Sequence, residues 1–300
     1  MVPTQIPLAT ILRDHAAWLE KPDTGRQADL SGMTLNDTSL ASAVLRRAIL
    51  VGTTLLDSNL ADADLSCAKL EGADLRRANL AGADLSGATL TATVFAGAWL
   101  QQSNLSEVCA AGATFKQASL DEARMLEASV NDASFFQATA VGASFHHSRF
   151  YDVDFTQAKL DGAIFYRSRL QHVRFAGVSG AGTSFGGAKV DHCDFTRAVL
   201  RGATFARAEV IQCVFSSADL RQCDFSEARL RGGDFARAVL TGARFGGAVL
   251  KMADFRGADL TGARELTSDQ LMQSVTDDAT ILPNGKRGPY LKNSGWERPK

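Results

Sequence analysis

Residues 73–87 read ADLRRANLAGADLSG, the clearest instance of a repeat that shapes most of the chain. It contains three five-residue units, each with a leucine at its centre and an alanine two positions earlier. The same spacing runs from Leu30 to Leu260, with every centre at a multiple of five. Of the 17 phenylalanines, all but Phe136 stand at such centres. The repeat therefore governs the whole of residues 28–262.

The period of five suggests short extended segments separated by corners. It fits neither the 3.6-residue α-helix nor the two-residue alternation of a strand. Within an extended segment, the centre and the residue two positions before it point to the same side, into a narrow interior. Glycine often stands two positions after the centre, as at Gly72 and Gly82. Such a position suits a turn with positive φ. We therefore predict coils whose sides are single repeats and whose interior is filled.

The units ANLAG at residues 78–82 and ADLSG at residues 83–87 resemble the A(D/N)LXX signature of the pentapeptide-repeat family. The resemblance covers residues 28–262. It implies an all-β solenoid, a right-handed quadrilateral β-helix with four repeats per coil. Residues twenty apart would then stack on one face, about 4.8 Å from each other. From Phe145 onward, phenylalanine occupies alternate centres, which predicts a core ladder of Phe165, Phe185, Phe205, Phe225 and Phe245.

Both ends of the repeat segment carry a predicted cap, because open coil ends would expose unpaired strand edges. In the N-terminal segment, residues 1–27, the stretch LATILRDHAAWLE has helical apolar spacing at Leu8, Leu12 and Ala16. In residues 263–283, Thr267 and Gln270 predict a capping box that opens a short helix containing Val275. The resemblance also allows a homodimer through this terminal helix. Residues 284–300 are predicted to be a basic flexible tail.

Composition excludes several partners. Across 300 residues the net charge is −1 and the pI is about 6.5, so direct binding to nucleic acid or to a membrane is not expected. The start lacks a secretory pattern, and the five cysteines do not form a disulfide framework, so we expect a cytoplasmic protein. The charge is nevertheless uneven. Residues 28–145 contain 13 acidic and 7 basic residues, net −6, and residues 146–262 contain 12 acidic and 16 basic, net +4.

No set of residues predicts catalysis, a cofactor or a metal. Cys193 and Cys213 stand one coil apart at the small inward position, where cysteine commonly replaces alanine. His192 should point outward, away from Cys193, so the two do not share a metal. The pair Gly180 and Gly182 lacks the third glycine of a dinucleotide loop, and Gly180 is expected to mark a thin place in the core. The sequence therefore predicts a protein that is not an enzyme.

Residues 124–174 place unusual side chains at outward positions. Residues twenty positions apart would stack in columns. One column, at the position after the centre, contains Leu126, His146 and Tyr166. Another, at the position before the centre, contains Arg149, Arg169 and Lys189. Aromatic and arginine side chains are typical anchors of protein interfaces. The alternative is ordinary solvated decoration of the wall. We predict a partner-binding surface that contains Leu126, Phe136, His146, Arg149, Tyr151, Tyr166, Arg167 and Arg169.

Two functions are compatible with these observations. The first is a non-catalytic interaction or scaffold protein that binds a protein partner of unknown identity through the outer faces. The second follows from the resemblance: some family members mimic duplex DNA and protect DNA gyrase or topoisomerase IV, the bacterial type II topoisomerases, from quinolones or toxins. Mimicry needs dense negative charge, and only residues 28–145 carry an acidic excess. The chain also lacks the loop insertions of many such protectors.

Overall fold

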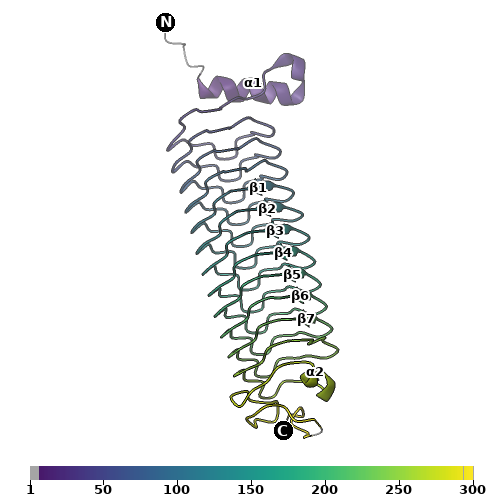
Figure 1. Ribbon diagram of the computed structural model, residues 1–300. Helices are drawn as coiled ribbons and strands as arrows, with labels where there is room; N and C mark the ends of the chain where they lie inside the picture. The colour runs from purple at the N-terminus through teal and green to yellow at the C-terminus, as the bar shows by residue number, and fades with distance from the viewer. Residues whose placement is uncertain (1–6, 293, 300) are drawn as a thin grey trace. The chain divides into compact units, whose positions relative to one another are not determined.

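The structure, a computed structural model, describes residues 7–292 and 294–299. Two compact units are distinguished, Met1–Ser134 and Phe135–Lys300. Each unit is a parallel β-solenoid in which short extended sides and tight corners alternate (Figure 1). Among the helices of the described residues, none has both the length and the apolar character needed to cross a bilayer.

The first unit begins with helix α1, Leu8–Glu20, and the 3-10 helix η1, Pro22–Thr24. Strands β1, Cys109–Ala111, and β2, Ser129–Asn131, pair in parallel, with Ala110 opposite Val130. Elsewhere in the unit, single parallel bridges join residues twenty apart, such as Asp64 and Asp84. Four repeats therefore complete one coil, as the resemblance implied.

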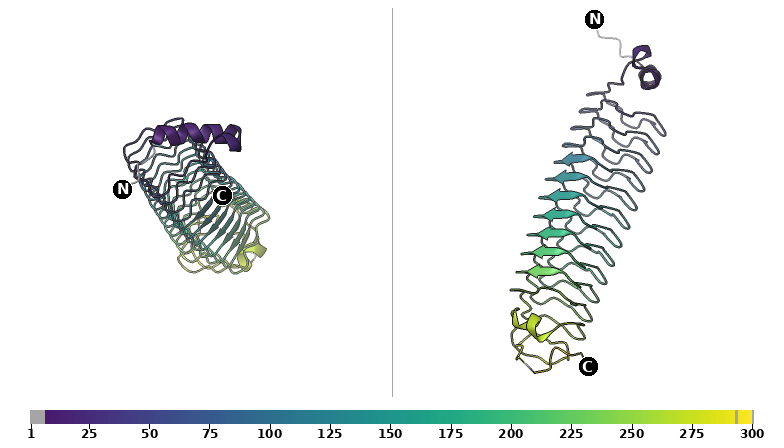
Figure 2. Two further views of the ribbon diagram at one scale, coloured as in Figure 1. Left: turned by 90° about the horizontal axis from the view of Figure 1, so that it is seen from above. Right: turned by 90° about the vertical axis from the view of Figure 1, so that its right-hand side faces the viewer.

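The second unit carries five strands on one side of its coils: β3, Arg149–Tyr151; β4, Arg169–Gln171; β5, Lys189–Asp191; β6, Glu209–Ile211; and β7, Arg229–Arg231. Each pairs in parallel and in register with the next (Figure 2, right). The middle residue of each strand points inward and is buried, whereas its two neighbours face outward. Residues of one column therefore meet across adjacent strands.

Bulky centres fill the interior of the second unit. Phe165 stacks on Phe185 with ring centroids 5.1 Å apart, and the spacings down the rest of the predicted ladder, Phe185, Phe205, Phe225 and Phe245, are 4.7, 5.2 and 5.4 Å. A second ladder on the opposite side meets it edge to face, as where Phe175 lies 5.8 Å from Phe165. Gly180 is not the thin place that the sequence suggested. A Cβ there would lie 2.8 Å from Leu200 Cδ2, because that side chain already fills the space.

Polar residues at the small inward position satisfy their hydrogen bonds within the coil stack. Thr53 Oγ1 donates to the carbonyl of Leu30 in the preceding coil, at 2.8 Å. The thiol of Cys223 donates in the same way to Leu200, at 2.9 Å. A donor of this size reaches a carbonyl that already accepts one backbone hydrogen bond, so it enters the core without leaving a polar group unpaired.

The residue before each centre explains why the repeat prefers Asp or Asn. Asp84 Oδ1 accepts a hydrogen bond from the amide of Ser86 at 2.9 Å, and Asn79 Oδ1 accepts one from Ala81 at 3.1 Å. Only a short side chain with an acceptor oxygen makes this Asx-turn. The consensus carboxylates therefore shape corners.

Every corner places the second residue after the centre at positive φ. Glycine takes this position at Gly72 with φ 65°, but Arg77 and Glu107 take it too, with φ 56° and 61°. The predicted positive-φ turn is therefore present. Residues other than glycine also adopt it, with their side chains pointing into solvent.

Helix α1 caps the first coil through a residue that the apolar pattern did not single out. The Ala28 amide donates to His15 Nδ1 at 3.0 Å, and His15 Nε2 contacts the Arg46 carbonyl at 3.1 Å. Because Nδ1 accepts, Nε2 carries the hydrogen, and the ring is neutral. Ala16, which the helical spacing placed on the covered face, is exposed, and His15 is buried instead.

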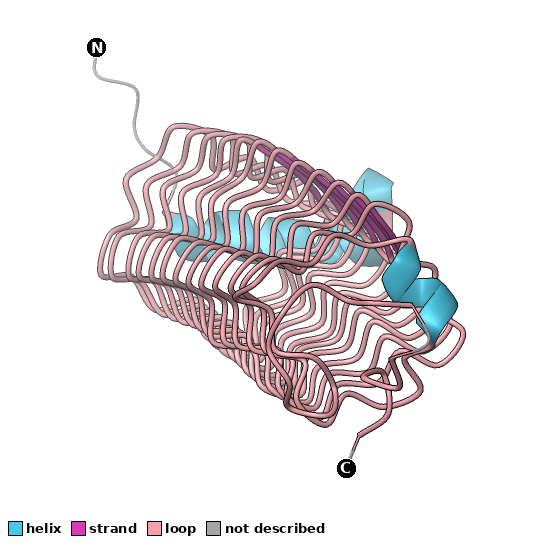
Figure 3. Cartoon of the chain, turned by 60° about the horizontal axis from the view of Figure 1, so that its bottom comes forward, coloured by secondary structure: helices cyan, strands magenta, loops and turns pink. Residues whose placement is uncertain are grey.

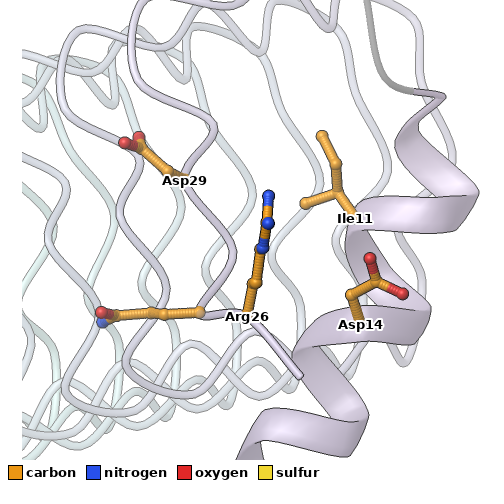
Figure 4. Close-up of a pocket in the computed structure, with 5 residues that line it drawn as sticks. Ile11, Asp14, Arg26 and Asp29 are labelled. Atoms are coloured by element: carbon orange, nitrogen blue, oxygen red, sulfur yellow. The ribbon is translucent and has the colours of Figure 1, made fainter. Parts of the chain in front are cut away.

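A small hollow of about 180 Å³ lies beside this cap. The Arg26 side chain extends into it, with Ile11 and Asp14 of α1 on one side and Asp29 of the first coil on the other (Figure 4). The hollow is part of the junction between the helix and the coil.

The C-terminal cap is built around helix α2, Ser268–Met272 (Figure 3). The predicted capping box between Thr267 and Gln270 is present. Gln270 Nε2 also donates to the carbonyls of Phe245 and Ala248, at 2.8 and 2.9 Å, groups that another coil would otherwise engage. Val275 lies beyond the helix and instead bridges to Asp254.

The described residues after α2 continue the cap. Ile281 forms an antiparallel bridge with Arg287, and Lys286 Nζ lies 5.2 Å from the ring centroid of Trp296. Flexibility of residues 284–300 stays a prediction.

Candidate partner-binding surface

The side of the second unit that carries β3, β4 and β5 holds most of the predicted partner residues. We use the name outer cluster for six of them: His146, Arg149, Tyr151, Tyr166, Arg167 and Arg169. Strand register brings Arg149 beside Arg169 and Tyr151 beside Gln171. The corner that precedes these strands carries His146 and, one coil later, Tyr166. The sequence columns within this unit are therefore real neighbours.

Tyr166 is held in place at that corner. Its ring centroid lies 5.9 Å from that of His146 and 5.1 Å from the guanidinium carbon of Arg167. Gly186 lies beside the ring, since a Cβ at Gly186 would be in van der Waals contact with Tyr166 Cδ2 at 3.4 Å. Tyr166 as a whole still exposes 37% of its surface, which leaves an aromatic residue available to a partner.

Arg149, Arg169 and Lys189 form the middle column of this side, and we call them the cation ladder. They are exposed and lie in register on β3, β4 and β5. Lys189 Nζ lies 3.7 Å from Glu209 on the next strand. Among the residues that the structure describes, neither Arg149 nor Arg169 forms an ion pair or a side-chain hydrogen bond. Two like charges are therefore stacked on neighbouring strands, with no carboxylate partner in the part of the chain that the structure describes.

Aromatic rings line the other margin of the ladder. Tyr151, with 44% of its surface exposed, meets the ring of His172 edge to face at 5.8 Å. The ring centroids of His172 and His192 are 5.3 Å apart. His192 Nδ1 lies 2.7 Å from Asp191 Oδ1. The sequence reasoning missed the ring contact between His172 and His192, although both follow the twenty-residue period.

Two of the predicted residues stand apart from the outer cluster. Leu126 belongs to the first unit and is half-buried. Phe136 follows the centre Phe135 and is also half-buried. Tyr166 follows the centre Phe165, which lies on a different side of the coil. A part in partner binding stays a prediction for both.

Two hollows adjoin the cluster. One, of about 350 Å³, lies next to Lys189, where Gly187 leaves a gap between the larger side chains of its column. The other, of about 610 Å³, is bordered by Tyr166, Arg167 and Arg244. Both are shallow depressions of the wall.

Elsewhere in the second unit, several arginines have carboxylate partners. Arg221 donates to Asp219 Oδ1 at 2.8 Å and Arg201 to Asp219 Oδ2 at 2.6 Å. Hydrogen bonding, first from Arg221 and then from Arg201, lowers the pKa of Asp219 to about 2 despite partial burial.

Within the outer cluster, burial is the main cause that lowers the pKa of His146, and the neighbouring His147 lowers it further. The His146 ring is therefore uncharged near neutral pH.

The cysteines that the sequence offered as a candidate pair form hydrogen bonds in the coil stack. Cys193 and Cys213 are free thiols that donate to the carbonyls of Leu170 and Val190, at 3.5 and 3.4 Å. Within the described part of the chain, no three His, Cys, Asp or Glu side chains are grouped so that they could hold a metal ion.

Comparisons with known proteins agree with this architecture. A family model described as pentapeptide repeats (8 copies) matches in overlapping segments from residue 26 to residue 166, and one described as a pentapeptide repeat region matches residues 188–264. No curated protein sequence gives a significant match.

Among solved structures, the chain is similar to HetL, a pentapeptide repeat protein of heterocyst differentiation regulation from the cyanobacterium Nostoc sp. strain PCC 7120. The identity is 24% over 94% of this chain and 100% of HetL, with a TM-score of 0.39. QnrB1, a plasmid-mediated fluoroquinolone resistance protein, is 22% identical over 57% of this chain and 82% of its own, with a TM-score of 0.31. A pentapeptide repeat protein from the Arabidopsis thaliana thylakoid lumen is 27% identical over 40% and 83%, with a TM-score of 0.31. Since the two family models together match more than half of its residues, the chain belongs to the pentapeptide repeat family.

Proposed function

We propose that the chain is a non-catalytic interaction or scaffold protein that binds a protein partner through the outer cluster of its second unit. The interior is occupied by stacked phenylalanines, so a ligand must engage the outside. The observation that supports this surface is the grouping of two exposed tyrosines with three arginines on neighbouring coils. Tyrosine and arginine supply much of the binding energy of protein interfaces.

Rigidity favours the same interpretation. Paired strands fix the backbone of the outer cluster, and the side chains of Arg167 and His146 contact the ring of Tyr166. Side chains that are already ordered lose little conformational entropy when a partner binds.

The test is a comparative purification from the source cell with three baits. These are the wild-type chain, Tyr166→Ala/Arg169→Ala, and the control Arg197→Ala/Arg237→Ala, which removes two exposed arginines from a different side of the coil. A partner should be retained by the wild type and the control and lost by the cluster variant, while all three baits keep the same melting temperature. If the cluster variant retains every partner of the wild type, the surface is wrong.

The alternative, protection of a type II topoisomerase by DNA mimicry, depends on the acidic excess of residues 28–145. Part of that charge is engaged in corners, since Asp64 and Asp84 each accept a backbone amide. A DNA gyrase supercoiling assay with a quinolone separates the two functions. Rescue of supercoiling by the wild-type chain would favour mimicry, whereas no rescue at a molar excess leaves the interaction function.

A further inference from the structure

In the cation ladder, Arg149 and Arg169 have no carboxylate partner among the described residues, and only Lys189 contacts one. Like charges that face each other on neighbouring strands repel. At the last rung the repulsion is relieved, because Lys189 contacts Glu209 one coil further along at 3.7 Å. In the neighbouring column, Arg207 contacts Glu227 in the same way at 3.1 Å. At Arg149 and Arg169 no carboxylate of the described residues takes that place.

From this arrangement we infer that the cation ladder binds an α-helix of a protein partner that carries one acidic residue per turn. The inference rests on the proposed function and names the chemistry of its partner. The helix would lie along the ladder, with its carboxylates opposite Arg149, Arg169 and Lys189 in turn.

The repeat distances favour a helix over other anionic partners. Neighbouring coils are about 4.8 Å apart, as between any paired strands. One turn of α-helix rises about 5.4 Å, so carboxylates three or four residues apart stay close to successive rungs. An extended peptide places same-side residues roughly 6.7 Å apart and loses register within two rungs.

The flanks of the ladder suit the same partner. Tyr166 with Arg167 stands on one margin, and Tyr151 with His172 on the other. These rings offer apolar contact to residues beside the acidic stripe of a helix. A nucleic acid duplex is wider, and its phosphates would also approach exposed Asp152 and the carboxylate of Asp191, which contacts His192.

The probe is a labelled synthetic alanine-rich helix of about 21 residues with glutamates at i, i+4, i+7 and i+11. An isomer of the same composition, with its glutamates spread around the helix, controls for net charge. Binding is followed by fluorescence anisotropy at physiological salt. We expect the striped peptide to bind at least about tenfold more tightly than the isomer.

Two protein variants complete the test. Arg149→Glu/Arg169→Glu should weaken binding of the striped peptide by about tenfold or more. Arg197→Glu/Arg237→Glu makes the same change in net charge at exposed arginines on another side of the coil, and it should change binding by less than about twofold. Circular dichroism verifies that both variants keep the wild-type fold.

Several outcomes would overturn the inference: equal binding of the two peptides, equal loss in the two variants, or a duplex oligonucleotide that displaces the striped peptide and binds more tightly. A dimer of the chain that only Arg149→Glu/Arg169→Glu dissolves would assign the ladder to a second copy. In each case the comparative purification still decides the proposed function separately, because it measures a cellular partner of Tyr166 and Arg169.

Discussion

Single residues in this chain act mainly through their place in the five-residue register. Cys193, Cys213 and Cys223 are buried at the small inward position, whereas Cys67 and Cys109 are exposed. Burial raises the pKa of Cys223 to about 12 and also raises that of Cys193. A buried protonated thiol is inert, since the thiolate is the reactive form.

Thiol labelling checks this difference. With a maleimide at neutral pH, Cys67 and Cys109 should react rapidly, and the other three only after denaturation. Mass spectrometry of the labelled peptides measures each site. Fast native labelling of Cys213 or Cys223 would show that the coil interior opens.

His15 makes the N-terminal cap sensitive to pH. Burial, partly offset by the Arg46 carbonyl, lowers the pKa of His15 below its ordinary 6.5. The unfolded chain therefore takes up the proton first. The contribution of His15 to the free energy of unfolding is complete above about pH 6.5 and is lost as the pH falls through the lowered folded pKa.

We expect the melting temperature of the wild type to fall between pH 7.5 and 5 by more than that of His15→Gln. His146, whose pKa is also lowered, is present in both proteins, so its effect cancels in the difference. Parallel pH profiles, measured by differential scanning calorimetry, would contradict the assigned role of His15.

At the scale of elements, each side of a coil is one extended segment whose centre points inward. Leu200 is fully buried, whereas its neighbour Val199 exposes 38% of its surface. The two residues are adjacent in the chain, but their side chains point in opposite directions. They therefore form a matched pair for the same substitution.

Leu200→Asp should lower the free energy of unfolding by more than about 4 kcal/mol, because a charge enters the core and an apolar group leaves it. Val199→Asp should change it by less than about 1 kcal/mol. Urea denaturation measures both. Similar losses in the two variants would mean that the alternation of inward and outward side chains is wrong.

At the scale of the whole molecule, pairing joins residues about twenty positions apart in both units. Each coil therefore contacts only its immediate neighbours, so the free energy of unfolding is approximately a sum of terms for single coils and for the interfaces between adjacent coils. A local defect should spread only over nearby coils.

Hydrogen exchange can map that spread. In Val190→Asp, amides between residues 170 and 210 should lose protection, whereas those around Leu60 should keep wild-type rates. Uniform loss of protection along the chain would indicate cooperativity across both units.

The outer cluster was predictable only in part. The twenty-residue spacing that the resemblance implied predicted that Arg149 lies next to Arg169 and that His146 lies next to Tyr166. It did not identify which arginines lack a carboxylate, because a pair such as Arg207 with Glu227 depends on side-chain reach between coils. Nor did it show that His172 contacts both Tyr151 and His192.

The amino-acid pattern alone predicts the repeat, the inward and outward positions, the positive-φ corners and the helix at residues 8–20. These follow from local size and backbone preferences that recur in every unit. The three-dimensional contacts settle the rest: His15 rather than Ala16 seals the first coil, α2 ends before Val275, and Arg149 and Arg169 have no carboxylate partner among the described residues. Such outcomes depend on which groups from distant coils come within hydrogen-bond or ion-pair distance, and a one-dimensional pattern does not contain those distances.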